Sequence, residues 1–117
     1  YHLRHSSKWI IRLGDGTIES HERSQSAIEN LWMFTNELFE MNEIDEEMIK
    51  QKVGVDRLSL KEEWNKIIDD TFTEATLKRP EDIHMTTGGR NGIHTEHLGH
   101  LLSDMQYLQR AYPDAIW

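Results

Sequence analysis

Cysteine is absent from the sequence, proline occurs only twice, and no long apolar run is present. Without cysteine the chain cannot form a disulfide framework, a thiolate zinc site or a thiol nucleophile. Its longest apolar stretches, such as residues 9–11, are far shorter than the ~20 residues that cross a bilayer, so we expect no membrane partner. The lack of thiols suits a reducing cytoplasm, which is where we expect the protein to reside.

Basic residues are also scarce. The 117 residues hold 13 Lys and Arg against 21 Asp and Glu, which gives a formal net charge of -8. A field of that sign repels polyphosphates, so the sequence argues against a nucleic-acid partner. The length suits one hydrophobic core, and we expect a single domain over residues 1–117.

The apolar residues recur at helical spacing, and no stretch alternates long enough for a sheet. We therefore predict an all-α protein. Gly14 is expected to end the first helix in the left-handed conformation, and Ser59 with Glu62 to form a capping box. The predicted helices cover residues 1–13, about 17–40, 42–52, 60–77 and 95–112, with a loop at 80–94.

We expect a set of large apolar side chains to hold helix to helix. All of them belong to the second and last predicted helices, each of which has an apolar face. The set comprises Trp32, Leu38, Phe39, Leu101, Met105, Tyr107 and Leu108.

Helical bundles often bind two irons through a Glu from each of two helices and a Glu-x-x-His pair from each of two others. In this sequence that pair occurs only once, from Glu81 to His84, within the predicted loop. A single pair cannot complete such a site. The alternative is that this pair has a structural role or faces solvent, and the sequence favours that interpretation.

Three histidines, His94, His97 and His100, recur at steps of three near the start of the last predicted helix. Steps of three turn successive side chains by about 300°, so all three cannot face one ion. One alternative is a metal site that combines His97 and His100 with Glu19 and Glu22. The favoured alternative is that these histidines bind a neighbouring loop or subunit.

Residues 88–92, Gly-Gly-Arg-Asn-Gly, have the composition of a glycine-rich anion cradle. They follow no predicted strand and lack the lysine of a phosphate-binding loop, which favours a flexible connection. Arg90 among these glycines is nevertheless able to clamp a carboxylate or phosphate of a partner. We therefore predict a partner contact formed by Arg90, His94, His97 and His100.

Three stretches together resemble the phenylacetic acid catabolic protein family: RLGDGTIESH at 12–21, LWMFTNELFE at 31–40 and GGRNGIHTEHLGHLLSDMQYLQRAYPDAIW at 88–117. The resemblance extends over nearly the whole chain but only over the C-terminal half of a family member. It implies a ferritin-like helical bundle that here lacks its N-terminal helices. It is strongest for the non-catalytic branch of the family.

The resemblance also implies a function. Family members form a multicomponent phenylacetyl-CoA epoxidase of aerobic phenylacetate catabolism, in which a related catalytic subunit contains the di-iron centre. By resemblance this chain is a structural subunit that supports that partner and binds no cofactor itself. The alternative is a ferritin-like di-iron enzyme or oxygenase in its own right. Because missing helices would expose apolar faces, we also expect the fragment to self-associate.

Overall fold

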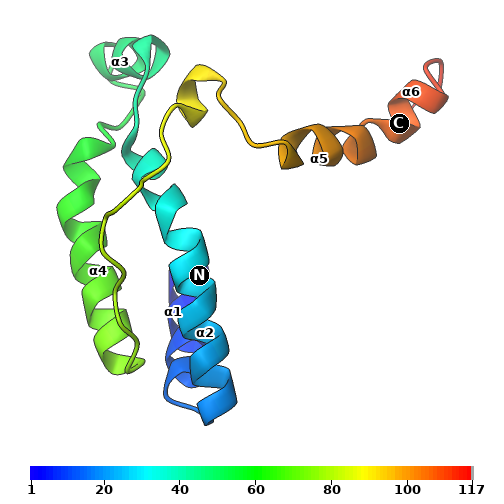
Figure 1. Cartoon of the computed structure of the whole chain (residues 1–117). Coiled ribbons are helices and arrows are strands. Elements are labelled where there is room, and N and C mark those ends of the chain that lie inside the picture. The colour runs from blue at the N-terminus through cyan, green and yellow to red at the C-terminus, as the bar shows by residue number, and fades with distance from the viewer. Residues whose placement is uncertain (117) are drawn as a thin grey trace.

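The computed structural model describes residues 1–116, and every regular element among them is a helix (Figure 1). The predicted all-α class is confirmed. Within these residues no helix is both long and apolar enough to span a membrane. The elements are α1 (His2–Gly14), α2 (Ile18–Leu31), η1 (Trp32–Phe39), α3 (Glu43–Lys50), η2 (Leu58–Leu60), α4 (Lys61–Glu74), η3 (Gly89–Asn91), α5 (His97–Met105) and α6 (Tyr107–Ala111), where η marks a 3-10 helix.

The turn between α1 and α2 is fixed by short polar side chains. Thr17 caps α2 by accepting a hydrogen bond from the Ser20 amide, and the Ser20 hydroxyl donates to the Leu13 carbonyl at 2.7 Å. Gly14 ends α1 as predicted, although its φ is not left-handed. Glycine is required because a Cβ there would meet the backbone oxygen of Ala75, which brings α1 against the end of α4.

The buried centre lies where α2 and η1 meet α4 and the residues that follow it. The Trp32 ring centroid lies 5.8 Å from that of Trp64 and 6.1 Å from that of Phe72. Aromatic pairs at such separations add stabilisation beyond the area that they bury. The buried cluster comprises Trp32, Phe72, Ala75 and Leu77, with Ile10, Ile11, Ile28, Trp64, Ile68 and Met85 packed against it.

An irregular segment, residues 77–86, runs back over α4 and α2 (Figure 1). Gln25 holds its start, because its side-chain amide donates to the Lys78 carbonyl and accepts from the Lys78 amide. Thr86 holds its end, because its amide and hydroxyl both donate to the Met33 carbonyl at 2.9 and 2.7 Å. The segment therefore closes one side of the α2/α4 pair.

The same contacts explain why α2 ends at Leu31 instead of continuing to about Glu40, which the sequence wrongly predicted. The Met33 carbonyl accepts from Thr86, and the Trp32 carbonyl accepts from the Thr35 hydroxyl at 2.8 Å. Of these two, only the Met33 bond comes from outside the helix, because a hydroxyl bond to the i−3 carbonyl also occurs within α1, at Ser6. The chain continues as the 3-10 helix η1.

The predicted capping box at Ser59 and Glu62 is wrong. The Ser59 hydroxyl donates backwards to the Asp56 carbonyl at 2.7 Å, and α4 begins at Lys61 without a side-chain cap. A capping box forms instead at α3, where Asn42 accepts from the Asp45 amide and Asp45 accepts from the Asn42 amide.

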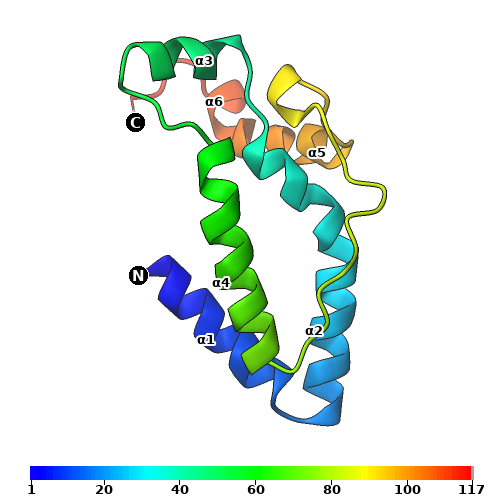
Figure 2. The same ribbon diagram turned by 90° about the vertical axis from the view of Figure 1, so that its left-hand side faces the viewer.

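Residues 94–116, called the arm below, extend away from the other helices (Figure 1), and Figure 2 looks along the arm from the opposite side of the molecule. The predicted single helix is broken at Gln106 into α5 and α6. The radius of gyration is 18.4 Å, against roughly 13 Å for a compact chain of this length. The expected helix contacts are confirmed for Trp32 and Phe39, which are buried, but wrong for those that lie exposed: Leu38, Leu101, Met105, Tyr107 and Leu108.

Candidate partner-binding site

The glycine-rich stretch binds carboxylates, and these belong to the same chain. The Gly88 amide donates to both oxygens of Glu40 at 3.2 and 3.0 Å, and the Gly89 amide donates to Glu37 Oε1 at 3.1 Å. Gly88 has a φ of +96°, and a Cβ on Gly89 would lie 2.9 Å from Glu37 Oε2. The positive φ of Gly88 favours glycine there, whereas the close neighbour of Gly89 is the flexible end of the Glu37 side chain, which can move aside.

Arg90 completes this arrangement by binding α3. Its Nε donates to Asp45 Oδ2 at 3.1 Å, and its Nη2 donates to Asp45 Oδ1. The Arg90 carbonyl accepts from the Asn42 side-chain amide at 3.1 Å. We call this set of contacts between residues 88–90 and Glu37, Glu40, Asn42 and Asp45 the loop latch.

Electrostatics at the loop latch favour the charged forms of Asp45 and Arg90. Hydrogen bonding from Arg90, and then from the Asn42 amide, lowers the pKa of Asp45 below its ordinary value of 3.8. The Asp45 carboxylate in turn raises the pKa of Arg90. Arg57 adds a second positive charge, with its Nε 3.9 Å from Asp45 Oδ1.

Arg90 was predicted to contact a partner, and the structure shows what it already binds. Its side chain is about one third exposed and paired with Asp45, so a partner would meet an ion pair instead of a free guanidinium. The contact with a partner stays a prediction. The role visible in the structure is to hold the root of the arm. Three residues after Arg90, the Ile93 amide donates to the Gly88 carbonyl at 3.0 Å.

The three arm histidines are exposed beyond this root. His94 precedes α5, and His97 and His100 lie in its first turns. Glu19 and Glu22, the other residues of the alternative metal set, lie in the first turns of α2, far from α5 (Figure 1). Among residues 1–116, no three histidine or acidic side chains gather closely enough to hold a metal ion. The structure therefore does not bring the alternative set together.

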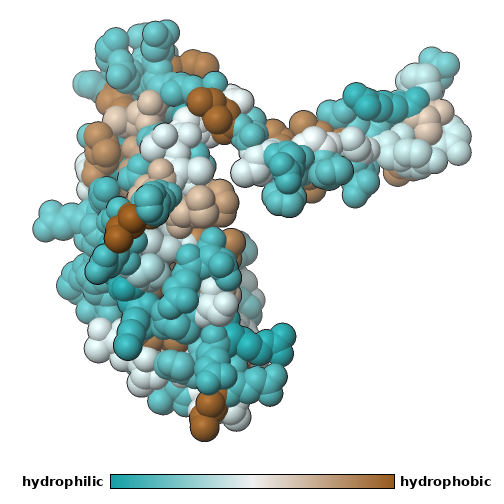
Figure 3. All heavy atoms as spheres, in the orientation of Figure 1, coloured by the Kyte–Doolittle hydropathy of each residue, from teal (hydrophilic) through white to brown (hydrophobic). Residues whose placement is uncertain are grey.

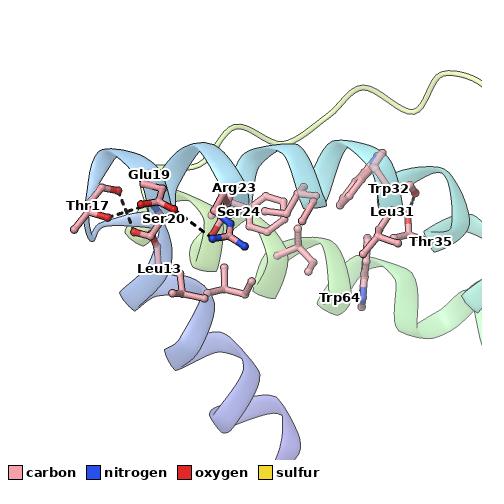
Figure 4. A pocket seen from close by; sticks show the side chains of 15 residues that line it. Leu13, Thr17, Glu19, Ser20, Arg23, Ser24, Leu31, Trp32, Thr35 and Trp64 are labelled. Atoms are coloured by element: carbon pink, nitrogen blue, oxygen red, sulfur yellow. Dashed lines mark hydrogen bonds and ion pairs between the residues drawn. The ribbon is translucent and has the colours of Figure 1, made fainter.

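An open apolar groove of about 690 Å³ lies between α1, α2 and α4, and Figure 4 shows its side chains. Among residues 1–116, the charged residues that line it are Glu19 and Arg23, which pair at 3.3 Å while each side chain is 80% exposed. A pair so exposed contributes little to stability. The lining comprises Ile10, Leu13, Thr17, Glu19, Ser20, Arg23, Ser24, Ala27, Ile28, Leu31, Trp32, Thr35, Trp64, Ile68 and Phe72.

Comparison with known proteins matches residues 1–117 to the phenylacetic acid catabolic protein family. The chain belongs to this family. It is 45% identical over 117 residues to the 1,2-phenylacetyl-CoA epoxidase subunit designated C of Escherichia coli (strain K12), a match that covers 100% of the chain and 47% of that relative. The chain thus spans about half the length of the curated relative that it matches.

Sequence reasoning missed several residues of this family member's loop latch. From the sequence we singled out Gly88, Gly89 and Arg90. We did not single out the carboxylates that bind them, which belong to Glu37, Glu40 and Asp45. A signal was available only for α3, because Asn42 followed three residues later by Asp45 is a capping pattern. Nothing in the local sequence indicates that the carboxylates of η1 point at glycines about 50 residues away.

Proposed function

We propose that this chain is a non-catalytic, structural subunit of a multicomponent phenylacetyl-CoA epoxidase, acting in the cytoplasm in aerobic phenylacetate catabolism. The observation that supports it best is how the chain uses its charged groups. The clusters around the candidate site fasten one segment to another: Arg90 to Asp45, and Glu37 and Glu40 to the glycine amides. Groups committed to such contacts position a surface and are not free for bond making.

Positioning of the arm is the mechanism that we infer. The loop latch fixes residues 88–93, and the exposed histidines His94, His97 and His100 begin immediately after them. Imidazole groups can donate and accept hydrogen bonds, so this polar edge suits a protein surface. We propose that it contacts the related catalytic subunit, which would contain the di-iron centre, whereas this chain itself binds no cofactor.

The test is reconstitution of the epoxidase with its catalytic subunit, with and without this chain, scored separately for assembly and for turnover. His97→Ala and Arg90→Ala should weaken assembly with the catalytic subunit. His2→Ala, which removes an exposed imidazole from α1, is the matched control and should leave assembly unchanged. Turnover per assembled complex should be the same for all three variants, because none of these residues takes part in the chemistry.

Two results would overturn the proposal. Stoichiometric iron retained by the purified chain after dialysis would favour the alternative, a ferritin-like di-iron enzyme in its own right. Failure to assemble with any related catalytic chain would favour an adaptor unrelated to phenylacetate.

A further inference from the structure

The glycine-rich stretch contains a dipeptide with a chemistry of its own, Asn91 followed by Gly92. No other asparagine of the sequence precedes a glycine. The others precede leucine, glutamate, glutamate and lysine, in the order Asn30, Asn36, Asn42 and Asn65. Glycine matters here because it has no Cβ to shield its own amide nitrogen from the preceding side chain. The side chain of Asn91 can therefore fold back onto the Gly92 nitrogen and close a five-membered ring.

The structure leaves room for this ring closure. Asn91 ends η3 and is exposed, and Gly92 follows it with a φ of +84°. A Cβ on Gly92 would meet nothing within 4 Å, so the space beside this residue is open. The Gly92 amide donates to the Gly89 carbonyl at 3.3 Å, just beyond the roughly 2.7–3.2 Å typical of such bonds. Ring closure therefore has one long hydrogen bond to break.

The stretch lies at the neck of the molecule, where the arm begins. η3 is the yellow turn just before the arm in Figure 1, and Figure 3 shows in the same orientation that the arm leaves the body as a narrow extension. A covalent change at Asn91 therefore falls beside the loop latch.

Other asparagines are held away from this reaction by their contacts. The Asn42 side chain caps α3, and the Asn65 side chain accepts from the Arg79 guanidinium at 2.7 Å. Each of these bonds keeps the side-chain amide turned away from the backbone nitrogen that follows it. Within residues 1–116, no hydrogen bond holds the side chain of Asn91 in this way.

Asp15 and Gly16 form a second dipeptide that can close the same ring, in this case with loss of water. A Cβ on Gly16 would lie 2.8 Å from both the Arg12 carbonyl oxygen and the Ser20 hydroxyl oxygen. The turn between α1 and α2 is therefore crowded where the turn at Gly92 is open. Crowding opposes the swing of a side chain onto the backbone, so this pair is a contrast within the same chain.

We propose that Asn91 and Gly92 form a site of spontaneous covalent modification, at which the chain loses ammonia and then takes up water. The deprotonated Gly92 nitrogen attacks Cγ of Asn91, and the new C–N bond closes a cyclic imide. The side-chain nitrogen leaves as ammonia, together with the proton that the Gly92 nitrogen gave up. Water then opens the ring. Cleavage between the nitrogen and Cγ gives aspartate at position 91, and cleavage at the backbone carbonyl gives isoaspartate, whose main chain runs through Cγ.

Both products disturb the loop latch. Each adds a carboxylate within three residues of the glycine amides that hold Glu37 and Glu40, so like charges are brought together. Isoaspartate also adds one atom to the main chain inside the turn that the Ile93 amide closes on the Gly88 carbonyl at 3.0 Å. The modification therefore loosens the root of the arm. It does not depend on the epoxidase assignment, because it needs only this dipeptide and water.

Peptide mapping by mass spectrometry tests the reaction, on the purified chain incubated at neutral and at mildly alkaline pH. Asn91 should convert severalfold faster than Asn36 and Asn42, as two separable products of equal mass. The rate should rise with pH, because the attacking nitrogen has to lose its proton. Conversion of Asn91 no faster than that of the other asparagines would overturn the proposal, as would faster formation of isoaspartate at Asp15 than at Asn91.

Hydrogen exchange at the Gly88 and Gly89 amides tests the effect on the loop latch. Both amides should exchange severalfold faster in the aged chain than in the fresh one. Asn91→Gln keeps the side-chain amide but needs a six-membered ring, which closes far more slowly, so this variant should not change with age. Asn36→Gln is the matched control and should age like the unmodified chain. Unchanged exchange in a chain whose Asn91 has converted, or equal ageing of Asn91→Gln, would overturn the proposed effect.

Discussion

Arg90 and Asp45, 45 residues apart in sequence, form a two-pronged contact in which Nε and Nη2 donate to the two carboxylate oxygens. Asp45 also accepts from the Asn42 amide, so one carboxylate caps α3 and holds the glycine loop. The Asp45 carboxylate therefore joins α3 to the glycine loop at the root of the arm.

The first prediction concerns the geometry of this contact. Arg90→Lys keeps the positive charge but loses the planar fork, so it cannot bind both oxygens of Asp45. The Gly88 and Gly89 amides should then exchange hydrogen faster, while amides of α4 keep their rates. Arg110→Lys, the same change on exposed α6, is the control. Unchanged exchange at Gly88 and Gly89 would show that the loop does not need the bidentate contact.

The second prediction concerns pH. The native pKa of Asp45 lies below 3.8, so its carboxylate contributes stability that is fully present above pH 3.8. That contribution is lost as the pH falls below 3.8 and through the lower native pKa. A carboxyl titration followed by NMR should show a midpoint for Asp45 below 3.8, and Arg90→Lys should move it upward. A midpoint of 3.8 or higher in the unmodified chain would refute the assigned cause.

Local sequence rules predicted the helices better than their ends. Apolar periodicity correctly placed α1, α3 and α4 because those patterns act within a few turns. The end of α2 could not be predicted, because the donor that removes the Met33 carbonyl from the helix is Thr86, 53 residues away. Ser59 lies in the turn before α4, where its hydroxyl donates to the Asp56 carbonyl, and α4 begins at Lys61 without a side-chain cap.

The candidate site was predictable only in part. The composition of residues 88–92 raised an anion cradle as an alternative, but the sequence favoured a flexible connection. The stretch does bind anions, and these are carboxylates of the same chain, which depends on how the chain folds over η1. The apolar face of the last predicted helix was also visible in the sequence. Its exposure was not, because a helical pattern shows which side chains share a face but not what covers that face.

The third prediction separates packing from hydrogen bonding at Trp32. This side chain is 5% exposed, its Nε1 donates to Asp82 Oδ1 at 2.8 Å, and Arg79 lies over its ring at 4.9 Å. Trp32→Ala should lower the free energy of unfolding by about 3–5 kcal/mol. Trp32→Phe keeps an aromatic ring and should cost less, because the hydrogen bond itself contributes about 1 kcal/mol. Urea denaturation measures the free energy of unfolding of both variants. Equal losses in the two variants would show that the aromatic ring of the Trp32→Phe variant recovers none of the packing stabilisation.

The fourth prediction uses two helical glycines as a matched pair. A Cβ on Gly14 would lie 2.9 Å from both Ala75 Cβ and Leu77 Cδ1, and closer still to the Ala75 carbonyl oxygen. Ala75 is fully buried, so neither neighbour can move into solvent. Gly14→Ala should therefore force α1 away from α4 and lower the free energy of unfolding by about 1–3 kcal/mol.

Gly99 is the control for the Gly14 substitution, because it lies within α5 and a Cβ there would meet nothing within 4 Å. Gly99→Ala should stabilise the helical form of the arm by about 0.5–1 kcal/mol, since alanine restricts the unfolded backbone more than glycine does. Urea denaturation measures the free energy of unfolding of the Gly14→Ala variant. Circular dichroism and the chemical shifts of α5 measure the helix content of the Gly99→Ala variant. Tolerance of alanine at position 14 would mean that α1 can shift along α4, and the groove between them would then have no fixed width.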